Sequence, residues 1–317
     1  MGLFNFRHKE PVIYKQSHKM EEELTQIETY LETHSNSNLE KKAKLIHYGI
    51  EGEKNILFEL KNSHLPIYVL HDLYYEYDHL NAQIDYVIIT PSKIYFLECK
   101  NLVGTIMIDQ YGNFSRSYSF HNRTIKEGIY SPITQSNRHL DLYQRMRGHD
   151  KGKVMKAMFD MQFKKNYQTL VVLANPQSIL KHRYAPKNIK NKVIKADQLI
   201  QYIKNHEESP IRNEKQMKET ADIFMSYHIE KEQVFQVPPE PTINREMLIG
   251  ALKSYRLAKA KENQLPAYYI FNDVTLNKLV EQLPQTLEEL KLVYGFGPKK
   301  SAAYGLDIIQ IIKENHG

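Results

Sequence analysis

The chain has 317 residues, a net charge of +6 at neutral pH and 41% hydrophobic residues, a composition typical of a folded globular protein. Its single cysteine, Cys99, excludes an internal disulfide and a cysteine-based zinc site. There is no run of about 18 apolar residues, and residues 1–9 lack the apolar stretch of a signal peptide. We therefore expect a cytoplasmic protein that has no membrane span.

The N-terminal part of the chain predicts helices followed by strands. Residues 17–46 place apolar side chains three and four positions apart, and the run Ser-Asn-Ser-Asn at 35–38 interrupts this helical pattern. We interpret residues 1–46 as a helical extension. The next predicted elements are a helix at 50–61 and strands at 67–73, 83–89 and 94–100.

The middle of the chain predicts an α/β domain. A turn at residues 110–113 separates two extended segments, which indicates a β-hairpin, and Ser131 followed by Pro132 is a typical helix start. The order of helices and strands predicts a mixed central sheet flanked by helices at residues 47–230, with a core motif region at 47–150. Its other predicted elements are strands at 105–109, 114–120, 170–174 and 192–195 and helices beginning near 197 and 211.

A proline-rich segment predicts a domain boundary. Residues 237–241 read Val-Pro-Pro-Glu-Pro, and three prolines in four positions cannot continue a helix or a central strand. We therefore expect a linker at residues 231–241. Beyond it the apolar residues keep a helical spacing, which predicts a small all-α bundle at residues 242–317.

Charge is distributed unevenly along the chain. Residues 104–205 contain 18 Lys and Arg against 6 Asp and Glu, whereas residues 47–103 contain 4 against 8. An acidic stretch followed by a basic one fits a metal site beside a surface that binds nucleic-acid phosphates. The alternative is a solvated surface that keeps the protein soluble.

Three charged side chains lie in two adjacent apolar strands. Side chains alternate along a strand, so Glu98 and Lys100 share one face, and a short turn folds their strand back beside Asp85. Mg²⁺ usually takes one or two protein carboxylates, and buried charges need a partner or a metal. We predict that Asp85 and Glu98 hold Mg²⁺, or Mn²⁺ in its place, and that Lys100 orients the attacking water or stabilises developing negative charge. The alternative is a structural ion pair between Glu98 and Lys100.

Two further side chains fit the same chemistry less directly. Glu53, on the preceding helix, could complete the metal coordination or hold a metal-bound water, and Gln135, on a later helix, could act as a neutral orienting group. His71, His79 and His139 lack the spacing of a metal site, which favours structural roles for them.

The chain resembles the nuclease-related domain (NERD) family in five blocks that occur in the same order. The blocks are Gly49–Glu53, Gln83–Asp85, Glu98–Asn101, Gly104–Ile106 and Ser131–Gln135. The resemblance covers about residues 45–150, and this family is similar to the PD-(D/E)xK restriction-endonuclease-like superfamily. It implies a restriction-endonuclease-like sheet, a DNA substrate and five matching site positions, which are Glu53, Asp85, Glu98, Lys100 and Gln135. The sequence departs from the family at Cys99, where an aliphatic residue is usual, and at Phe114, where tryptophan is frequent.

The C-terminal part resembles the HRDC domain of RecQ-like helicases and RNase D. The matching residues are Leu248, Leu252, Arg256, Pro266, Tyr268, Leu276, Pro284, Leu290, Gly295–Gly297, Lys300, Tyr304 and Gly305. The resemblance implies an auxiliary nucleic-acid-binding module. A glycine turn before a helix exposes backbone N–H groups to phosphate, so we predict nucleic-acid contacts at Gly295, Gly297, Lys299 and Lys300. The alternatives are a simple interhelix turn with Phe296 as a core residue, or a protein-binding module.

Together these features predict a Mg²⁺-dependent nuclease that acts on DNA, with an HRDC-like domain that helps to bind it. One alternative is a non-catalytic DNA-binding or scaffold protein that recruits a helicase or repair enzyme. The other is an RNA-processing nuclease.

Overall fold

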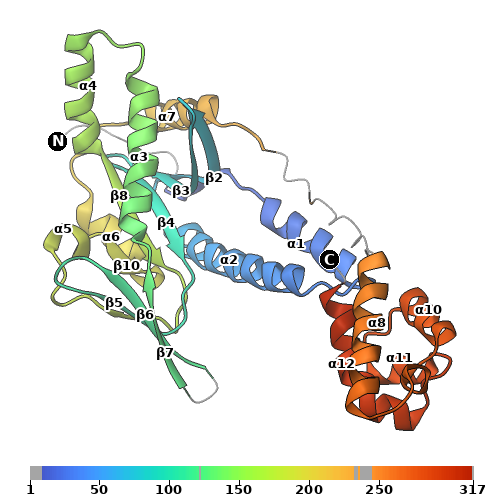
Figure 1. The fold of residues 1–317 in the computed structure, drawn as a ribbon. Coiled ribbons are helices and arrows are strands. Elements are labelled where there is room, and N and C mark those ends of the chain that lie inside the picture. The colour runs from blue at the N-terminus through green and yellow to red at the C-terminus, as the bar shows by residue number, and fades with distance from the viewer. Residues whose placement is uncertain (1–8, 121–122, 232–234, 236–244, 316–317) are drawn as a thin grey trace. The chain divides into compact units, whose positions relative to one another are not determined.

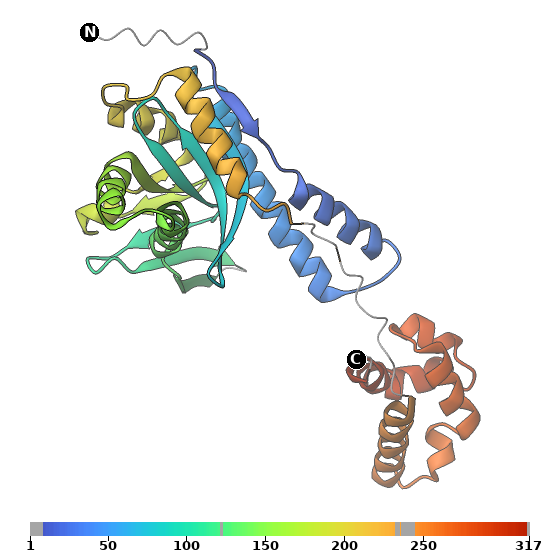
Figure 2. The same ribbon diagram turned by 90° about the horizontal axis from the view of Figure 1, so that it is seen from above.

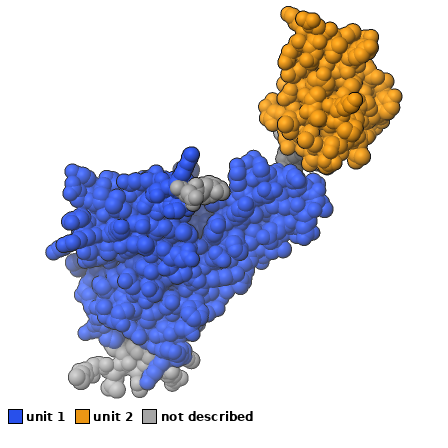
Figure 3. All heavy atoms as spheres, turned by 90° about the horizontal axis from the view of Figure 1, so that it is seen from below, with its two compact units in different colours: residues 1–235 blue, residues 236–317 orange. Residues whose placement is uncertain are grey.

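The computed structural model describes residues 9–120, 123–231, 235 and 245–315. The chain divides into two compact units, residues 1–235 and residues 236–317 (Figure 3). The linker predicted at residues 231–241 lies almost entirely outside the described residues.

The first unit is built on a six-stranded mixed sheet with the strand order β1-β2-β3-β4-β8-β10 (Figure 1). β3 is antiparallel to both of its neighbours, β2 and β4, whereas β1, β8 and β10 run parallel to the strands they pair with. The strands are β1 (Val12–Lys15), β2 (Tyr68–Tyr77), β3 (Leu80–Ile89), β4 (Ile94–Lys100), β8 (Tyr167–Leu173) and β10 (Val193–Lys195).

A second sheet has the order β7-β6-β5-β9 and continues from the end of the first. Its strands are β5 (Thr105–Ile108), β6 (Phe114–Phe120), β7 (Arg123–Ile129) and β9 (Ile179–Lys181). The segments that follow β4 and β8 leave the first sheet together, because Ala174 N donates to Lys100 O and Ile179 N donates to Gly104 O, both at 3.0 Å. They run directly into β5 and β9, which are paired in parallel.

Helices cover both faces of the six-stranded sheet (Figure 1). The side chains of α3, α4 and α7 pack on one face, and those of α2 and α6 pack on the other. The helices of this unit are α1 (Lys19–Leu31), α2 (Ser37–Lys61), α3 (Pro132–Gly148), α4 (Lys153–Asn166), α5 (Lys187–Lys190), α6 (Leu199–His206) and α7 (Glu214–Tyr227), with a 3₁₀ turn at Ala196–Gln198. These layers agree with the predicted α/β class.

The N-terminal region differs from its prediction. Instead of an extension that ends at residue 46 and a helix that starts at residue 50, α2 is one continuous helix from Ser37. The side chain of Asn36 caps it by accepting hydrogen bonds from Asn38 N and Leu39 N, and α1 packs alongside its first half (Figure 2). The interruption predicted at residues 35–38 falls where α1 ends and α2 begins.

Several short or exposed elements were not predicted. These are β1, β7, β9, α4 and α5, and the extension of β2 to Tyr77. β2 turns into β3 through Asp78 and His79, which have φ values of 50° and 60°, the geometry of a two-residue hairpin turn. This turn lacks the asparagine-glycine pair that normally marks it in a sequence.

The second unit is all helical, as predicted. Its helices are α8 (Arg245–Glu262), α9 (Ala267–Ile270), α10 (Asp273–Gln282), α11 (Leu287–Leu292) and α12 (Pro298–Glu314). They enclose one apolar core that includes Leu252, Leu279, Phe296 and Ile308. Across the described part of the chain, no helix has the length and apolar character needed to cross a membrane.

Candidate functional site

The candidate site lies where β3 and β4 separate. The last residue pair between the two strands is Tyr86 with Leu97, and the final three residues of β4 pair only with β8. At this point the side chain of Asp85 replaces the missing backbone partner, because its Oδ2 accepts a hydrogen bond from the backbone N–H of Cys99 at 2.6 Å. Asp85 is thereby held next to Glu98, which is directly opposite it in register.

The backbone of β2 and β3 is irregular at the same level. Asp72 and Asp85 face each other between the pairs His71–Tyr86 and Leu73–Ile84, and Asp72 has a φ of 57°. In a regular strand, side chains three residues apart point to opposite faces of the sheet. Leu70 and Leu73 nevertheless enter the same core, so the alternation of buried side chains changes here, and it changes on both strands. The pairing register is the same on both sides of these residues, so this is a local change of backbone conformation without an inserted residue.

Glu98 is buried and only half satisfied. Its side chain is 3% exposed, and Lys100 Nζ donates to its Oε1 at 2.6 Å and to Gln135 Oε1 at 3.2 Å. The other oxygen, Oε2, is buried and accepts no hydrogen bond from the described residues. His139 Nδ1 is 3.7 Å from it, beyond hydrogen-bonding distance. Glu98 therefore presents one carboxylate oxygen that lacks a donor.

Gln135 and His139 come from α3. Ser131 caps this helix by accepting a hydrogen bond from Thr134 N, and Pro132 occupies its first turn, as the sequence predicted. This start places Gln135 against Lys100 and puts His139 one turn further along, on the same side.

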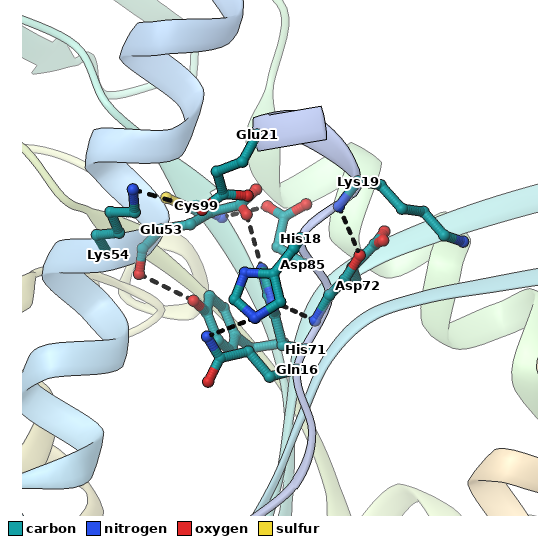
Figure 4. A network of polar contacts seen from close by, with 12 residues as sticks. Gln16, His18, Lys19, Glu21, Glu53, Lys54, His71, Asp72, Asp85 and Cys99 are labelled. Atoms are coloured by element: carbon teal, nitrogen blue, oxygen red, sulfur yellow. Dashed lines mark hydrogen bonds and ion pairs between the residues drawn. The ribbon is translucent and has the colours of Figure 1, made fainter. Parts of the chain in front are cut away.

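Glu53 approaches from α2, on the other side of the site (Figure 4). Its Oε2 is 2.7 Å from His71 Nε2, while the backbone N–H of Ser17 points at His71 Nδ1 at 3.3 Å. Because Nδ1 accepts from Ser17, the ring proton lies on Nε2 and is donated to Glu53. Tyr86 stacks on the His71 ring, and its hydroxyl donates to the backbone carbonyl of Glu53.

The N-terminal segment closes this side of the site. Lys15 Nζ donates to the carbonyls of His71 and Asp72. Ser17 and the first turn of α1 line a small pocket together with Glu53 and Asp85. Neither this role nor the contacts of His71 and His139 followed from the sequence, where the histidines were interpreted as structural. A histidine directly before a strand aspartate, Asp72, was the available signal for His71.

A glycine permits α2 to come close to the end of β4. A Cβ at Gly52 would lie 2.6 Å from Cβ of Asn101 and 3.3 Å from Sγ of Cys99. The side chain of Asn101 also ties the helix down, because its amide nitrogen donates to the carbonyl of Tyr48 at 2.5 Å. The close approach brings the first turn after Gly52, which carries Glu53, beside the strand.

Burial and like charge dominate the electrostatics. The pKa of Asp85 is raised well above its usual value by burial and then by the carboxylates of Glu98 and Glu53. Burial also raises the pKa of Glu98, although Lys100 opposes the shift. The pKa of His139 falls to about 4, mainly through burial and then through Lys100, so its ring is neutral at pH 7. The site lacks positive charge relative to its carboxylates.

These side chains fit a hard cation held by two carboxylates. In the described residues no group of three or more His, Cys, Asp or Glu side chains is arranged to hold a metal. Mg²⁺ does not require such a group, because it keeps several waters and commonly uses one or two carboxylates. A bound cation would give Oε2 of Glu98 a partner and would stabilise the ionised form of Asp85, which burial disfavours.

Comparison with known proteins assigns two domains. Residues 48–174 match the family model of the nuclease-related domain, and residues 245–312 match that of the HRDC domain. The chain carries a nuclease-related domain and an HRDC domain. The nuclease-related domain contains all five predicted site residues, and the structure gathers them around the separated ends of β3 and β4: Glu53, Asp85, Glu98, Lys100 and Gln135.

Part of the chain is similar to DNA helicases. Over 68 residues it is 41% identical to the ATP-dependent DNA helicase UvrD2 of Mycobacterium bovis and of Mycobacterium tuberculosis, a match that spans 22% of this chain and 10% of each helicase. The chain therefore covers about a tenth of those helicases. Among solved structures, HRDC domain 3 of D. radiodurans RecQ is 35% identical, with 22% of this chain and 93% of that one covered and a TM-score of 0.22.

The predicted nucleic-acid loop of the HRDC domain has a packing role. Phe296 is 1% exposed and belongs to the domain core, as the alternative interpretation proposed. Gly295 has a φ of +90°, and Gly297 caps α12. Lys299 is exposed and Lys300 is half-buried at the start of that helix. The contacts of these residues with nucleic acid remain a prediction.

Proposed function

We propose that the nuclease-related domain is a Mg²⁺-dependent nuclease that hydrolyses the phosphodiester bonds of DNA and that Mn²⁺ can replace Mg²⁺. The observation that carries this proposal is Oε2 of Glu98, a buried carboxylate oxygen without a donor in the described part of the chain. The Glu98 carboxylate interacts with that of Asp85, and its other oxygen, Oε1, accepts from Lys100. A buried anionic oxygen is costly unless a donor or cation faces it.

Asp85 and Glu98 would hold the metal ion, which when bound supplies a Lewis acid for the phosphate and lowers the pKa of water. Lys100 is oriented by its hydrogen bonds to Glu98 and Gln135, and a quarter of its side chain remains exposed. Its ammonium can therefore donate to an attacking water or a phosphate oxygen. Gln135 fixes that ammonium without adding charge.

Glu53 adds a third carboxylate from the opposite side. Its hydrogen bond from His71 fixes one oxygen and leaves the other free to accept from a water. We assign Glu53 the role of holding a water at the metal side of the site and His71 the role of positioning Glu53.

The HRDC domain is proposed to bind DNA beside the nuclease domain through Gly295, Gly297, Lys299 and Lys300. The matched relatives are ATP-dependent DNA helicases by name, which supports DNA as the ligand and a helicase or repair protein as a partner.

One observation favours a non-catalytic alternative. The ion pair between Lys100 and Glu98, at 2.6 Å, gives Lys100 a partner and satisfies one oxygen of Glu98 without a metal. Such a site would suit a DNA-binding scaffold that keeps the fold without turnover.

The test compares the full chain with Asp85→Ala, Glu98→Ala and Lys100→Ala on matched DNA and RNA substrates, with Mg²⁺, with Mn²⁺ and with chelator. We expect metal-dependent DNA cleavage that falls by about 10²-fold or more in each variant, while DNA affinity persists. Metal alone should raise the melting temperature of the unaltered chain but not of Asp85→Ala.

Salt-dependent DNA affinity without cleavage under either metal would establish the scaffold alternative. Preferential cleavage of the RNA would establish the RNA-processing alternative. Equal, metal-independent cleavage by all four proteins would indicate a contaminant and remove the proposal.

A further inference from the structure

A groove of about 810 Å³ opens on the second sheet, away from the carboxylates of the candidate site. One wall is the turn between β5 and β6, and the other is the segment that follows β9. Its floor is apolar and includes Met107, Ile108 and Leu180. A cavity of this size fits a ligand rather than a few waters.

Two exposed tyrosines stand at the groove. Tyr111 is 77% exposed and Tyr184 is 75% exposed, which is unusual for large aromatic side chains. Tyr111 is presented by a rigid turn, because Asp109 Oδ1 accepts from the N–H groups of Tyr111 and Asn113 at 2.8 and 2.9 Å. Gly112, with a φ of +84°, lets this turn pack on Ile189 of α5. The backbone that carries the Tyr111 ring is therefore held in place before any ligand arrives.

Cations surround the tyrosines without acidic partners. Lys181, Arg183 and Lys190 line the groove, and within the described residues none of them is paired with a carboxylate. The guanidinium of Arg183 lies over the ring of Tyr184, 5.7 Å from its centre. Asp109 is the acidic residue of the lining, and its carboxylate is already engaged in the turn. Residues 181–195 contain six Lys and Arg and no Asp or Glu. The groove thus offers positive charge to an anionic ligand.

We propose that this groove binds single-stranded nucleic acid, with bases stacked on Tyr111 and Tyr184 and phosphates on Lys181, Arg183 and Lys190. Exposed aromatic faces beside a basic groove are the features that single-strand binding uses, since every unpaired base has a face to stack. A duplex keeps those faces inside its own stack. The assignment rests on the proposed function in one respect, which is that the chain acts on nucleic acid.

The groove is joined to the candidate site by covalent structure. Met107 lies seven residues beyond Lys100, so even a fully extended connection keeps their Cα atoms within about 25 Å. β5 and β9, which form the groove, are the direct continuations of β4 and β8. A strand of several nucleotides bound here could therefore extend to Asp85 and Glu98.

The chain contains no tryptophan, which permits a direct test. Tyr111→Trp and Tyr184→Trp each introduce a single tryptophan, and Phe58→Trp is the matched control, because Phe58 is 66% exposed on α2, outside the groove. All are made in the full chain with Asp85→Ala and titrated in chelator with oligothymidylate, its duplex with oligoadenylate, and polyglutamate. We expect oligothymidylate to quench the two groove tryptophans and to leave the control unchanged.

Affinity provides the second measurement. Tyr111→Ala and Tyr184→Ala should each weaken oligothymidylate binding about tenfold, a change of about 1.4 kcal/mol. Lys181→Glu with Arg183→Glu should weaken it further and reduce the salt dependence, whereas Lys41→Glu with Lys44→Glu on α2 should not.

Unchanged affinity in both tyrosine variants, together with unquenched groove tryptophans, would overturn the assignment even if the chain cleaves DNA. Quenching by polyglutamate alone would reassign the groove to an acidic protein, and equal binding of duplex would also overturn it. Binding is measured without metal and with the Asp85→Ala variant. The result for the groove therefore does not depend on whether the chain cleaves DNA.

Discussion

His71 donates its Nε2 proton to Glu53 at 2.7 Å, and the N–H of Ser17 contacts the other nitrogen of the same ring at 3.3 Å. The N-terminal segment therefore selects the tautomer that holds Glu53. This relationship links a segment outside the matched nuclease-related domain to a predicted site residue inside it.

Replacing His71 tests its positioning role. His71→Ala should lower the free energy of unfolding by about 2 kcal/mol, because a buried ring stacked on Tyr86 is lost, and should also reduce cleavage. His71→Gln keeps a donor near the place of Nε2 and should recover most of the cleavage rate. Urea unfolding and single-turnover cleavage measure the two effects, and a glutamine variant as slow as the alanine variant would contradict the role.

Asp85→Asn should stabilise the metal-free protein. The raised pKa of Asp85 means that the folded state disfavours the ionised carboxyl, so the wild type loses stability relative to the asparagine variant as the pH rises above the unfolded value. Asparagine can still accept from Cys99 N. Melting temperatures in chelator should differ more at pH 8 than at pH 4, and a variant less stable than wild type at pH 8 would refute this account.

Gly52→Ala and Gly49→Ala form a matched pair on one helix. At position 52 the new methyl group would meet Asn101 at 2.6 Å, and we expect a loss of about 1–3 kcal/mol. At position 49 the nearest atom is Met20 Sδ at 3.6 Å, and alanine should add up to about 1 kcal/mol through helix propensity. Urea unfolding measures both, and equal stabilisation by the two changes would show that α2 does not press on β4.

A second glycine pair tests the HRDC loop. Gly295→Ala would place a methyl group 2.2 Å from Thr275 Oγ1 at a φ of +90°, and it should destabilise the domain by about 1–3 kcal/mol. Gly297→Ala meets no atom within 4 Å and should change stability little. Limited proteolysis of the HRDC domain reports the difference, and similar protection of both variants would exclude a conformational need for glycine at 295.

The strand residues of the site were predictable because their pattern is local. Apolar runs set the register of β4, so the shared side of Glu98 and Lys100 followed from alternation, and the turn after β3 brought Asp85 beside them. Gln135 followed from the helix start at Ser131 and Pro132. Local signals of this kind do not depend on the rest of the fold.

The remaining parts depend on contacts between distant segments. The contact of Ser17 with His71 joins residues 54 positions apart, and the irregular backbone at Asp72 and Asp85 arises from the pairing of two strands. The continuity of α2 depends on a neighbouring strand that leaves room for Gly52. The spacing of apolar residues along the sequence does not indicate contacts between distant segments.

The limits of the family match are not the limits of a folding unit. A fragment of residues 48–174 would begin inside α2, losing its capped start, and would lack the β1 and β10 edges of the sheet as well as α7. It would also lose Ser17 and Lys15, leaving His71 without the amide that orients it. Excision at the homology borders therefore produces a chain with exposed strand edges, prone to aggregate, and its inactivity would say nothing about the chemistry of the intact protein.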